Sequence, residues 1–157
     1  MYIEQGFKNN IMNLIAALIG VLIGFLILAI SYRVKKKPKN IFDAAREKEL
    51  TLFKKYMQTQ KNLLNAGDYM GLTPLMLAII NFNDVNLIRE LIEAGAGVNY
   101  VDKKGNSALH YAVLNNNPDV VKVLINKGIN KSHNNSEGKS ALDIAKEKGL
   151  EVADLLY

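Results

Sequence analysis

The residues of this chain that most resemble a catalytic set lie close together in the sequence. Asp102, Ser107 and His110 would supply an acid, a nucleophile and a base within nine residues. However, Ser107 and His110 are three residues apart at the start of a predicted helix, and the sequence around them implies neither an oxyanion hole nor a pocket. We therefore predict that these residues are structural and that the chain is not an enzyme.

Metal and cofactor chemistry has no better support in the sequence. His133 stands alone in a polar stretch, the chain has no cysteine, and no second histidine is near His133 in the sequence. We therefore expect a solvated His133 and no zinc site. No phosphate-binding glycine loop is present, and we predict no cofactor. The absence of cysteine also excludes disulfides, which fits the cytosol.

Three glycines define an internal repeat. Gly71, Gly105 and Gly138 stand 34 and 33 residues apart and open the similar phrases GLTPLMLA, GNSALHYA and GKSALDIA. A period close to 33 is typical of a helical solenoid, in which each unit buries its apolar face by stacking on its neighbours. The repeat therefore predicts an extended binding surface rather than a catalytic pocket.

Residues 40–157 resemble the ankyrin-repeat family in these phrases and in the paired aliphatic residues that follow them at helical spacing. The resemblance implies an all-α helical solenoid of about 3.5 to 4 repeats with β-hairpin-like loops. We divide it into an N-terminal cap repeat, two full repeats and a C-terminal cap repeat, at residues 40–67, 68–101, 102–134 and 135–157.

The shared residues have predicted structural roles. The three hairpin glycines supply a positive φ, and Pro74 begins a helix, where its missing N–H is harmless. Gly95 and Gly128 are predicted to cap the carboxyl ends of helices. Small residues are expected where helices pack closely, at Ala78, Ala112 and Ala145.

The family resemblance also assigns structural roles to the residues of the apparent catalytic set. It implies that Ser107 and His110 tie the start of a helix together, and that Asp102 stabilises the hairpin. The histidine is replaced by Met76 in one copy and by Asp143 in the last, which predicts a weaker tie in those repeats.

Residues 11–32 form a run of 22 residues without a charge. As a helix this run would rise about 33 Å, enough to cross a hydrocarbon core of ~30 Å. We predict a single transmembrane helix that follows a short N-terminal segment, residues 1–10. A cleaved signal peptide fits less well, because the run is too long and no small-residue cleavage site follows it.

A basic juxtamembrane linker, residues 33–39, follows this run and contains five Lys and Arg residues. Such a flank predicts a cytoplasmic soluble domain and serves either as a stop-transfer signal or to recruit acidic lipids. An uncleaved signal anchor would instead place the domain outside the cytoplasm. Residues 40–157 contain 14 Lys and Arg and 14 Asp and Glu, so the net charge of +5 does not indicate nucleic-acid binding.

Small residues recur every four positions inside the predicted span, at Ala16, Gly20 and Gly24. Such a stripe permits close contact between membrane helices and is compatible with a homodimer. Glycine is also common in membrane helices in general, which leaves both interpretations open.

In ankyrin-like proteins the hairpin tips and the inner face of the first helices recognise partners. This face also includes Asn81, Asn115, Glu147 and Lys148. We expect an apolar and aromatic stripe here, although Leu77, Tyr111 and Ile144 are alternatively buried between helices. The predicted partner-binding residues are Tyr69, Met70, Leu72, Leu77, Ile80, Lys103, Lys104, Asn106, Tyr111, Leu114, Glu137, Lys139 and Ile144.

The sequence thus predicts a membrane-anchored ankyrin-repeat module that binds another protein at the membrane and has no catalysis of its own. One alternative is an immunity or inhibitor protein that occludes a toxin or an enzyme at the same membrane. Another is a regulatory subunit whose span pairs with a larger membrane protein.

Overall fold

The computed structural model describes residues 12, 14–26 and 37–157, which fall into two units separated after Lys37. In the first unit, residues 14–26 are helical. Among the residues that the structure describes, no helix has both the length and the apolar character needed to cross a membrane. The predicted span at 11–32 extends beyond the described residues at both ends, as does most of the basic linker, so the span stays a prediction.

The small-residue stripe falls within the described part of this helix. Ala16 and Gly20 are exposed and Gly24 is half-buried. A Cβ added to either glycine would meet no atom within 4 Å. The pairing of this stripe in a homodimer stays a prediction.

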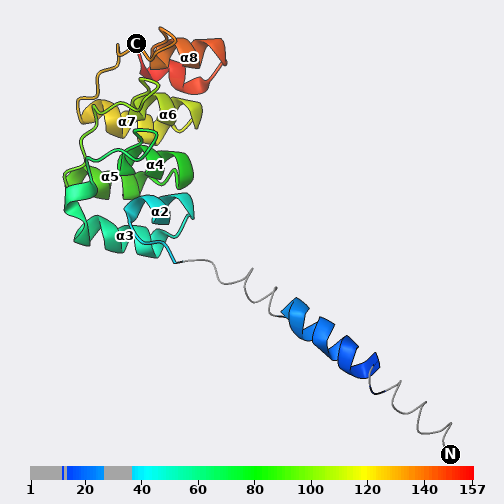
Figure 1. The fold of residues 1–157 in the computed structure, drawn as a ribbon. Coiled ribbons are helices and arrows are strands. Elements are labelled where there is room, and N and C mark those ends of the chain that lie inside the picture. The colour runs from blue at the N-terminus through cyan, green and yellow to red at the C-terminus, as the bar shows by residue number, and fades with distance from the viewer. Residues whose placement is uncertain (1–11, 13, 27–36) are drawn as a thin grey trace, which may run out of the picture. The chain divides into compact units, whose positions relative to one another are not determined.

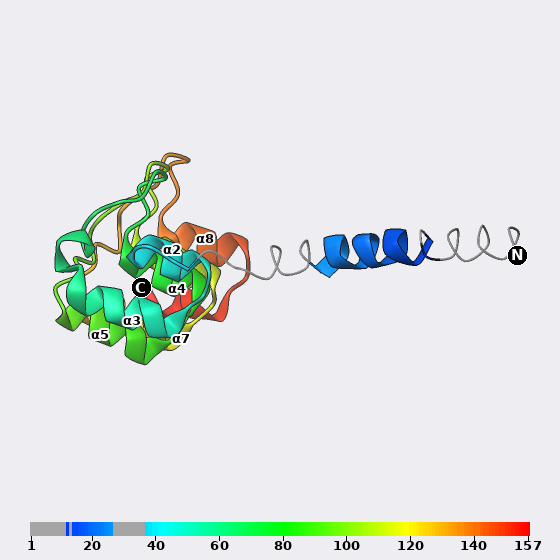
Figure 2. The same ribbon diagram turned by 60° about the horizontal axis from the view of Figure 1, so that its bottom comes forward.

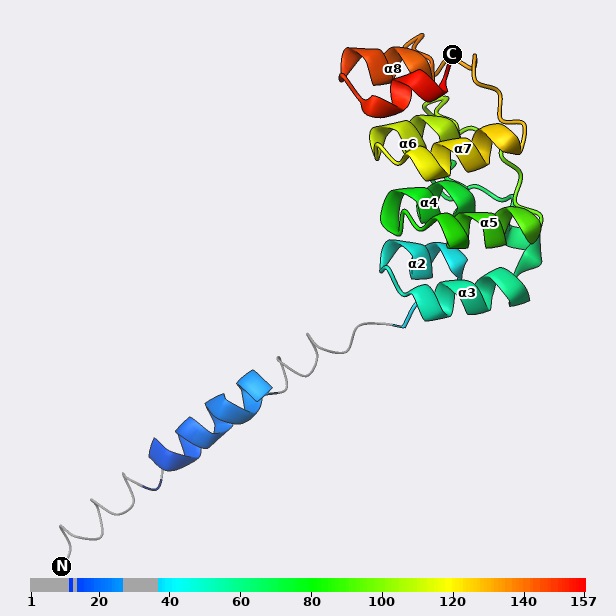
Figure 3. The same ribbon diagram turned by 180° about the vertical axis from the view of Figure 1, so that it is seen from behind.

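The second unit is a stack of antiparallel helix pairs in chain order (Figures 1 and 3). The prediction of an all-α solenoid is confirmed: residues 37–157 contain no strand, only two isolated bridges, Val101 with Ser107 and Asn134 with Ser140. Three pairs consist of two α-helices: α2 (Ile41–Arg46) with α3 (Leu50–Thr59), α4 (Pro74–Asn81) with α5 (Val85–Glu93), and α6 (Ala108–Leu114) with α7 (Pro118–Asn126). In the last pair, α8 (Ala141–Glu147) packs with the short 3₁₀-helix η2 (Glu151–Leu155). Another 3₁₀-helix, η1 (Lys61–Leu63), follows α3.

Local sequence explains where the helices begin. Thr73 precedes α4 and accepts a hydrogen bond from the N–H of Met76, and Pro74 occupies the first helical position as predicted. Asp84 and Asn117 cap α5 and α7 in the same way, each accepting from two backbone N–H groups. These side chains satisfy donors that the helix itself leaves unpaired.

The turns also follow the repeat. Gly71, Gly105 and Gly138 all have a positive φ, as predicted, and so do Gly95 and Gly128. At Gly71 a side chain is also excluded by lack of space, because an added Cβ would lie 2.9 Å from the backbone nitrogen of Lys103 in the next hairpin. Glycine is therefore required there by the stacking of hairpins as well as by conformation.

The core lies between the helix layers and is continuous along the stack. The three repeat alanines, Ala78, Ala112 and Ala145, are fully buried, as predicted. In the atypical first repeat, Phe53 is fully buried and its ring centroid lies 5.3 Å from that of Phe82 in the next repeat. Each repeat thus buries its apolar side against its neighbour.

Candidate functional site

The hairpin tips project together to one side of the helices (Figure 2). They are joined by backbone hydrogen bonds: the N–H of Lys103 donates to Met70 O at 3.0 Å, and the N–H of Ser136 donates to Lys104 O at 2.9 Å. Within each tip an aspartate or asparagine side chain accepts two N–H groups; at Asp102 the donors are Lys104 and Asn106, both at 2.8 Å. The tips therefore form one ordered edge.

The apparent catalytic set is not assembled as a catalytic triad. The backbone N–H of Ser107 donates to His110 Nδ1 at 3.1 Å, so Nδ1 is unprotonated, and Ser107 Oγ lies 2.8 Å from the same nitrogen. The other ring nitrogen, Nε2, donates to Lys139 O at 3.1 Å rather than to a carboxylate. Since Ser107 and His110 are also buried, the predicted structural tie is confirmed.

Burial lowers the pKa of His110, although the hydrogen bond to Lys139 O opposes this shift and favours the charged form. The neutral ring is the form that accepts from Ser107. The tie therefore depends on an uncharged imidazole that connects α6 to the following repeat.

The prediction of an isolated, solvated His133 was wrong. Its Nε2 donates to Gly105 O at 2.9 Å, and its ring meets His110 edge-on, with 6.1 Å between centroids. The two histidines are far apart in sequence, and only the stacking of repeats brings them together. In the described part of the chain no group of three or more metal-binding side chains is present.

The last repeat keeps the tie that the sequence predicted to be weaker. Asp143 Oδ2 accepts from Ser140 N at 2.9 Å and from Ser140 Oγ at 2.6 Å, so the carboxylate replaces the imidazole. These hydrogen bonds lower the pKa of Asp143. In α4, by contrast, the equivalent residue is Met76, which is buried and has no polar hydrogen-bonding group to replace the imidazole.

Tyr111 connects α6 to its hairpin. The side chain is half-buried, and its hydroxyl donates to Asp102 Oδ2. Burial raises the pKa of Tyr111, and the hydrogen bond to the Asp102 carboxylate raises it further. Tyr111 therefore has a structural role in addition to any contact with a partner, and the sequence contained no signal for this hydrogen bond.

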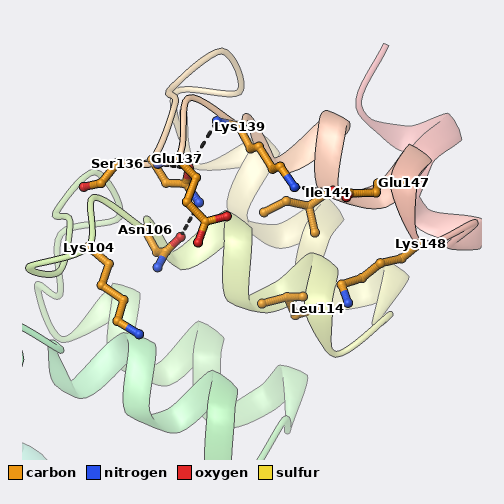
Figure 4. A pocket seen from close by; sticks show the side chains of 10 residues that line it. Lys104, Asn106, Leu114, Ser136, Glu137, Lys139, Ile144, Glu147 and Lys148 are labelled. Carbon is orange, nitrogen blue, oxygen red and sulfur yellow. Dashed lines mark hydrogen bonds and ion pairs between the residues drawn. The ribbon is translucent and has the colours of Figure 1, made fainter.

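A groove of about 640 Å³ lies between the second and third hairpin tips and helices α6 and α8 (Figure 4). It brings together six of the predicted binding residues with Glu147 and Lys148. The six are Lys104, Asn106, Leu114, Glu137, Lys139 and Ile144. Asn135 and Ser136 also line it and were not predicted, although the repeat period places Asn135 at the position of Asp102.

The other predicted residues divide by burial. Tyr69, Met70, Ile80 and Lys103 are exposed, and Tyr69 lies 5.0 Å from the guanidinium of Arg46, a contact absent from our prediction. Leu72 and Leu77 are buried, at 8% and 3% exposed, and Tyr111 is half-buried. Within the groove, Ile144 is also only 8% exposed, so the expected apolar stripe is interrupted.

Comparison with known proteins agrees with this architecture. The family model described as ankyrin repeats in three copies matches residues 41–135 and 81–157. The E3 ubiquitin-protein ligase hecd-1 of Caenorhabditis elegans is 33% identical over 110 residues, which are 70% of this chain and 4% of that protein. Protein fem-1 homolog C of Xenopus laevis is 37% identical over 95 residues, 60% of this chain and 14% of that protein.

A third relative, the human palmitoyltransferase ZDHHC17, is 42% identical over 77 residues, which are 48% of this chain and 12% of that protein. The chain thus spans only a small part of each of these relatives. The similarity concerns the repeats, which the family model also matches over most of the chain. The chain belongs to the ankyrin-repeat proteins.

Proposed function

We propose that this chain is a protein-interaction module that holds its partner against the hairpin tips and the first helix of each pair. Ankyrin repeats are generally interaction modules rather than catalysts. The observation that carries the proposal is the set of exposed apolar residues on this side of the repeats, with Leu114 45% exposed at the groove and Ile80 at the equivalent position one repeat earlier. Exposed apolar residues beside a groove are typical of a protein-binding surface.

Site-specific photocrosslinking in cells tests this proposal. A photoreactive residue at Leu114 should capture a partner protein, whereas the same residue at Leu50, which is 38% exposed on α3, should not. Equal capture at both positions, or capture at Leu50 alone, would place the binding surface elsewhere.

We propose further that residues 11–32 anchor the module in a membrane, with the repeats on the cytoplasmic side and the small-residue stripe available for a homodimer. The support is the uncharged run and the basic residues that follow it. The full chain should remain in membranes after a carbonate wash. Recovery of the full chain in the soluble fraction would contradict the anchor.

Because the chain has no cysteine, a single introduced thiol reports on orientation without background. Ser132→Cys lies at an exposed position of the repeat unit. A maleimide reagent that does not cross membranes should label it only after cells are lysed. Labelling in intact cells would instead place the repeats outside the cytoplasm.

A further inference from the structure

We infer that the groove between the second and third hairpins recognises a protein segment in which a bulky apolar side chain is flanked by carboxylates. This inference rests on the proposed function, which names the surface but not the chemistry of the partner. Three observations support it. The groove has apolar side chains, these are surrounded by charges, and the polar groups of the hairpins already form hydrogen bonds within the protein.

The apolar part of the groove is small and well defined. Leu114 presents nearly half of its surface to solvent, and Ile144 also lines the groove although it is mostly buried. The volume of about 640 Å³ lies within the range of pockets that hold small ligands or a few side chains. The groove therefore suits one large apolar side chain with its neighbouring backbone.

The charges around this apolar part are mostly positive once internal pairs are removed. Lys139 and Glu147 neutralise each other at 2.6 Å. Among the described residues, Lys104 and Lys148 take part in no ion pair. Figure 4 shows Lys104 extending from the hairpin tip and Lys148 from the end of α8, with Leu114 between them. Carboxylates on either side of an apolar residue would match this arrangement.

One further lysine lies close to the groove without lining it. Lys103 is exposed beside Lys104 at the same hairpin tip. Glu137 is the opposing charge, and in the described part of the chain it also has no ion-pair partner. Lys103, Lys104 and Lys148 therefore outnumber Glu137, which favours an acidic segment over a basic one.

The polar groups of the hairpins are already used within the protein. Asn135 Nδ2 donates to Asn106 Oδ1 at 2.9 Å, and Asn135 Oδ1 accepts from the N–H groups of Glu137 and Lys139. These amides have little capacity left for a partner. Selectivity must then come from the lysines and the apolar side chains.

A polyanion such as a nucleic acid fits these observations less well. Glu137 lies within the groove, and residues 40–157 carry equal numbers of acidic and basic residues. Binding to nucleic acid generally depends on a continuous basic surface that neutralises several phosphates. A short acidic and apolar peptide segment needs only the few cations present here.

The test is selection from a random 12-residue peptide display library against the full chain held in detergent micelles. We expect enrichment of peptides in which Leu, Ile, Phe or Met is flanked by Asp or Glu. Enrichment of basic or uncharged peptides, binding of a dT20 oligonucleotide in preference to the peptides, or no enrichment would each overturn the inference.

Variants then locate the binding of an enriched peptide, measured by fluorescence anisotropy. The double variant Lys104→Glu/Lys148→Glu should weaken binding by about tenfold or more, because both attractions become repulsions. The matched control, Lys122→Glu/Lys127→Glu at exposed sites of α7 and its carboxyl end, makes the same change in net charge and should alter binding less than about twofold. Thermal melting verifies that each variant is folded. An equal effect of the two double variants would overturn the inference.

Leu114→Asp distinguishes this inference from the proposed function. If the enriched peptides are basic or uncharged but still require Leu114, the groove binds protein segments and only the predicted chemistry is wrong. If acidic peptides bind and Leu114→Asp has no effect on them, the proposed surface is wrong together with the inference.

Discussion

The third and last repeats use the same tie at the start of the first helix, but in opposite environments. In α6 the Ser107–His110 pair is buried and also reaches Lys139 O in the next repeat. In α8 the Ser140–Asp143 pair is exposed, and its hydrogen bonds stay within the turn. The comparison indicates that the third repeat uses this position to join its neighbour, whereas the last repeat uses it only to begin a helix.

The largest expected difference between the two repeats comes from introducing a charge into their helix contacts. Ala112→Asp would bury an unpaired carboxylate inside the stack, at a cost of several kcal/mol against a total stability of ~5 to 15. We expect the cooperative melting transition of the 38–157 fragment to be lost. Ala145→Asp, at the equivalent fully buried site of α8, should unfold mainly the last repeat.

Hydrogen exchange distinguishes these outcomes residue by residue. Protection in α4 and α5 should be lost in Ala112→Asp and retained in Ala145→Asp. Equal loss in both variants would mean that the stack unfolds as a single unit and that position along it has no influence.

Removing the tie should lower the free energy of unfolding less than a buried charge does, and again by more in the third repeat than in the last. His110→Ala leaves Lys139 O and the N–H of Ser107 without their partners and creates a cavity, so we expect a loss of about 2–4 kcal/mol in the free energy of unfolding. Asp143→Ala removes an exposed group and should cost less. Urea denaturation measures both, and a similar loss in the two variants would contradict the comparison.

Tyr111→Phe tests the hydrogen bond between Tyr111 on α6 and Asp102 in the hairpin of the third repeat. The change removes the hydrogen bond to Asp102 but leaves the ring, and we expect a loss of about 1–2 kcal/mol, since hydrogen bonds to charged groups are stronger than neutral ones. Affinity for the partner should change little. A full loss of binding at unchanged stability would instead assign the hydroxyl to the binding surface.

The two ties should also respond to acid in different pH ranges. The pKa of His110 in the folded state is below its unfolded value of 6.5, so its stabilising effect is present above pH 6.5 and is lost as pH falls through the folded pKa. Asp143 also has a lowered pKa, and its effect is present above its unfolded value of 3.8 and is lost only below it. His110→Gln should flatten the stability profile just below pH 6.5, whereas Asp143→Asn should leave that range unchanged.

The smallest predicted effect lies in the first repeat. The turn between paired helices has a positive φ at Asn83, Asn116 and Gly149, residues suited to it, but the first repeat has Lys48 with a φ of 57°. Lys48→Gly should raise the free energy of unfolding by about 0.5 kcal/mol, because relief of the backbone outweighs the added freedom of the unfolded chain. The control Lys48→Ala keeps the Cβ and should give no gain in thermal melting.

Much of the fold was predictable because its signals are local. The hairpin glycines, the helix start at Pro74 and the buried alanines depend on the conformation and size of single residues, which recur with the repeat. The same regularity predicted which loops and helix faces lie on the side proposed to bind a partner. It did not predict which residues on that side remain exposed.

The tertiary structure decided which of these residues remain exposed. Leu72 and Leu77 are buried while Met70 and Ile80 are exposed, although all four were predicted to share one surface. Their burial depends on the distance between helices of neighbouring repeats. That distance cannot be inferred from the sequence of a single repeat.

By itself, then, the sequence determined the repeat, its helices and its caps, since these arise from interactions between residues near one another in the chain. Only the stacked structure placed His133 beside His110 and brought Lys104 and Lys148 to one groove. These arrangements depend on how hairpins and helices of adjacent repeats align, and that alignment comes from the shape of the shared core between them.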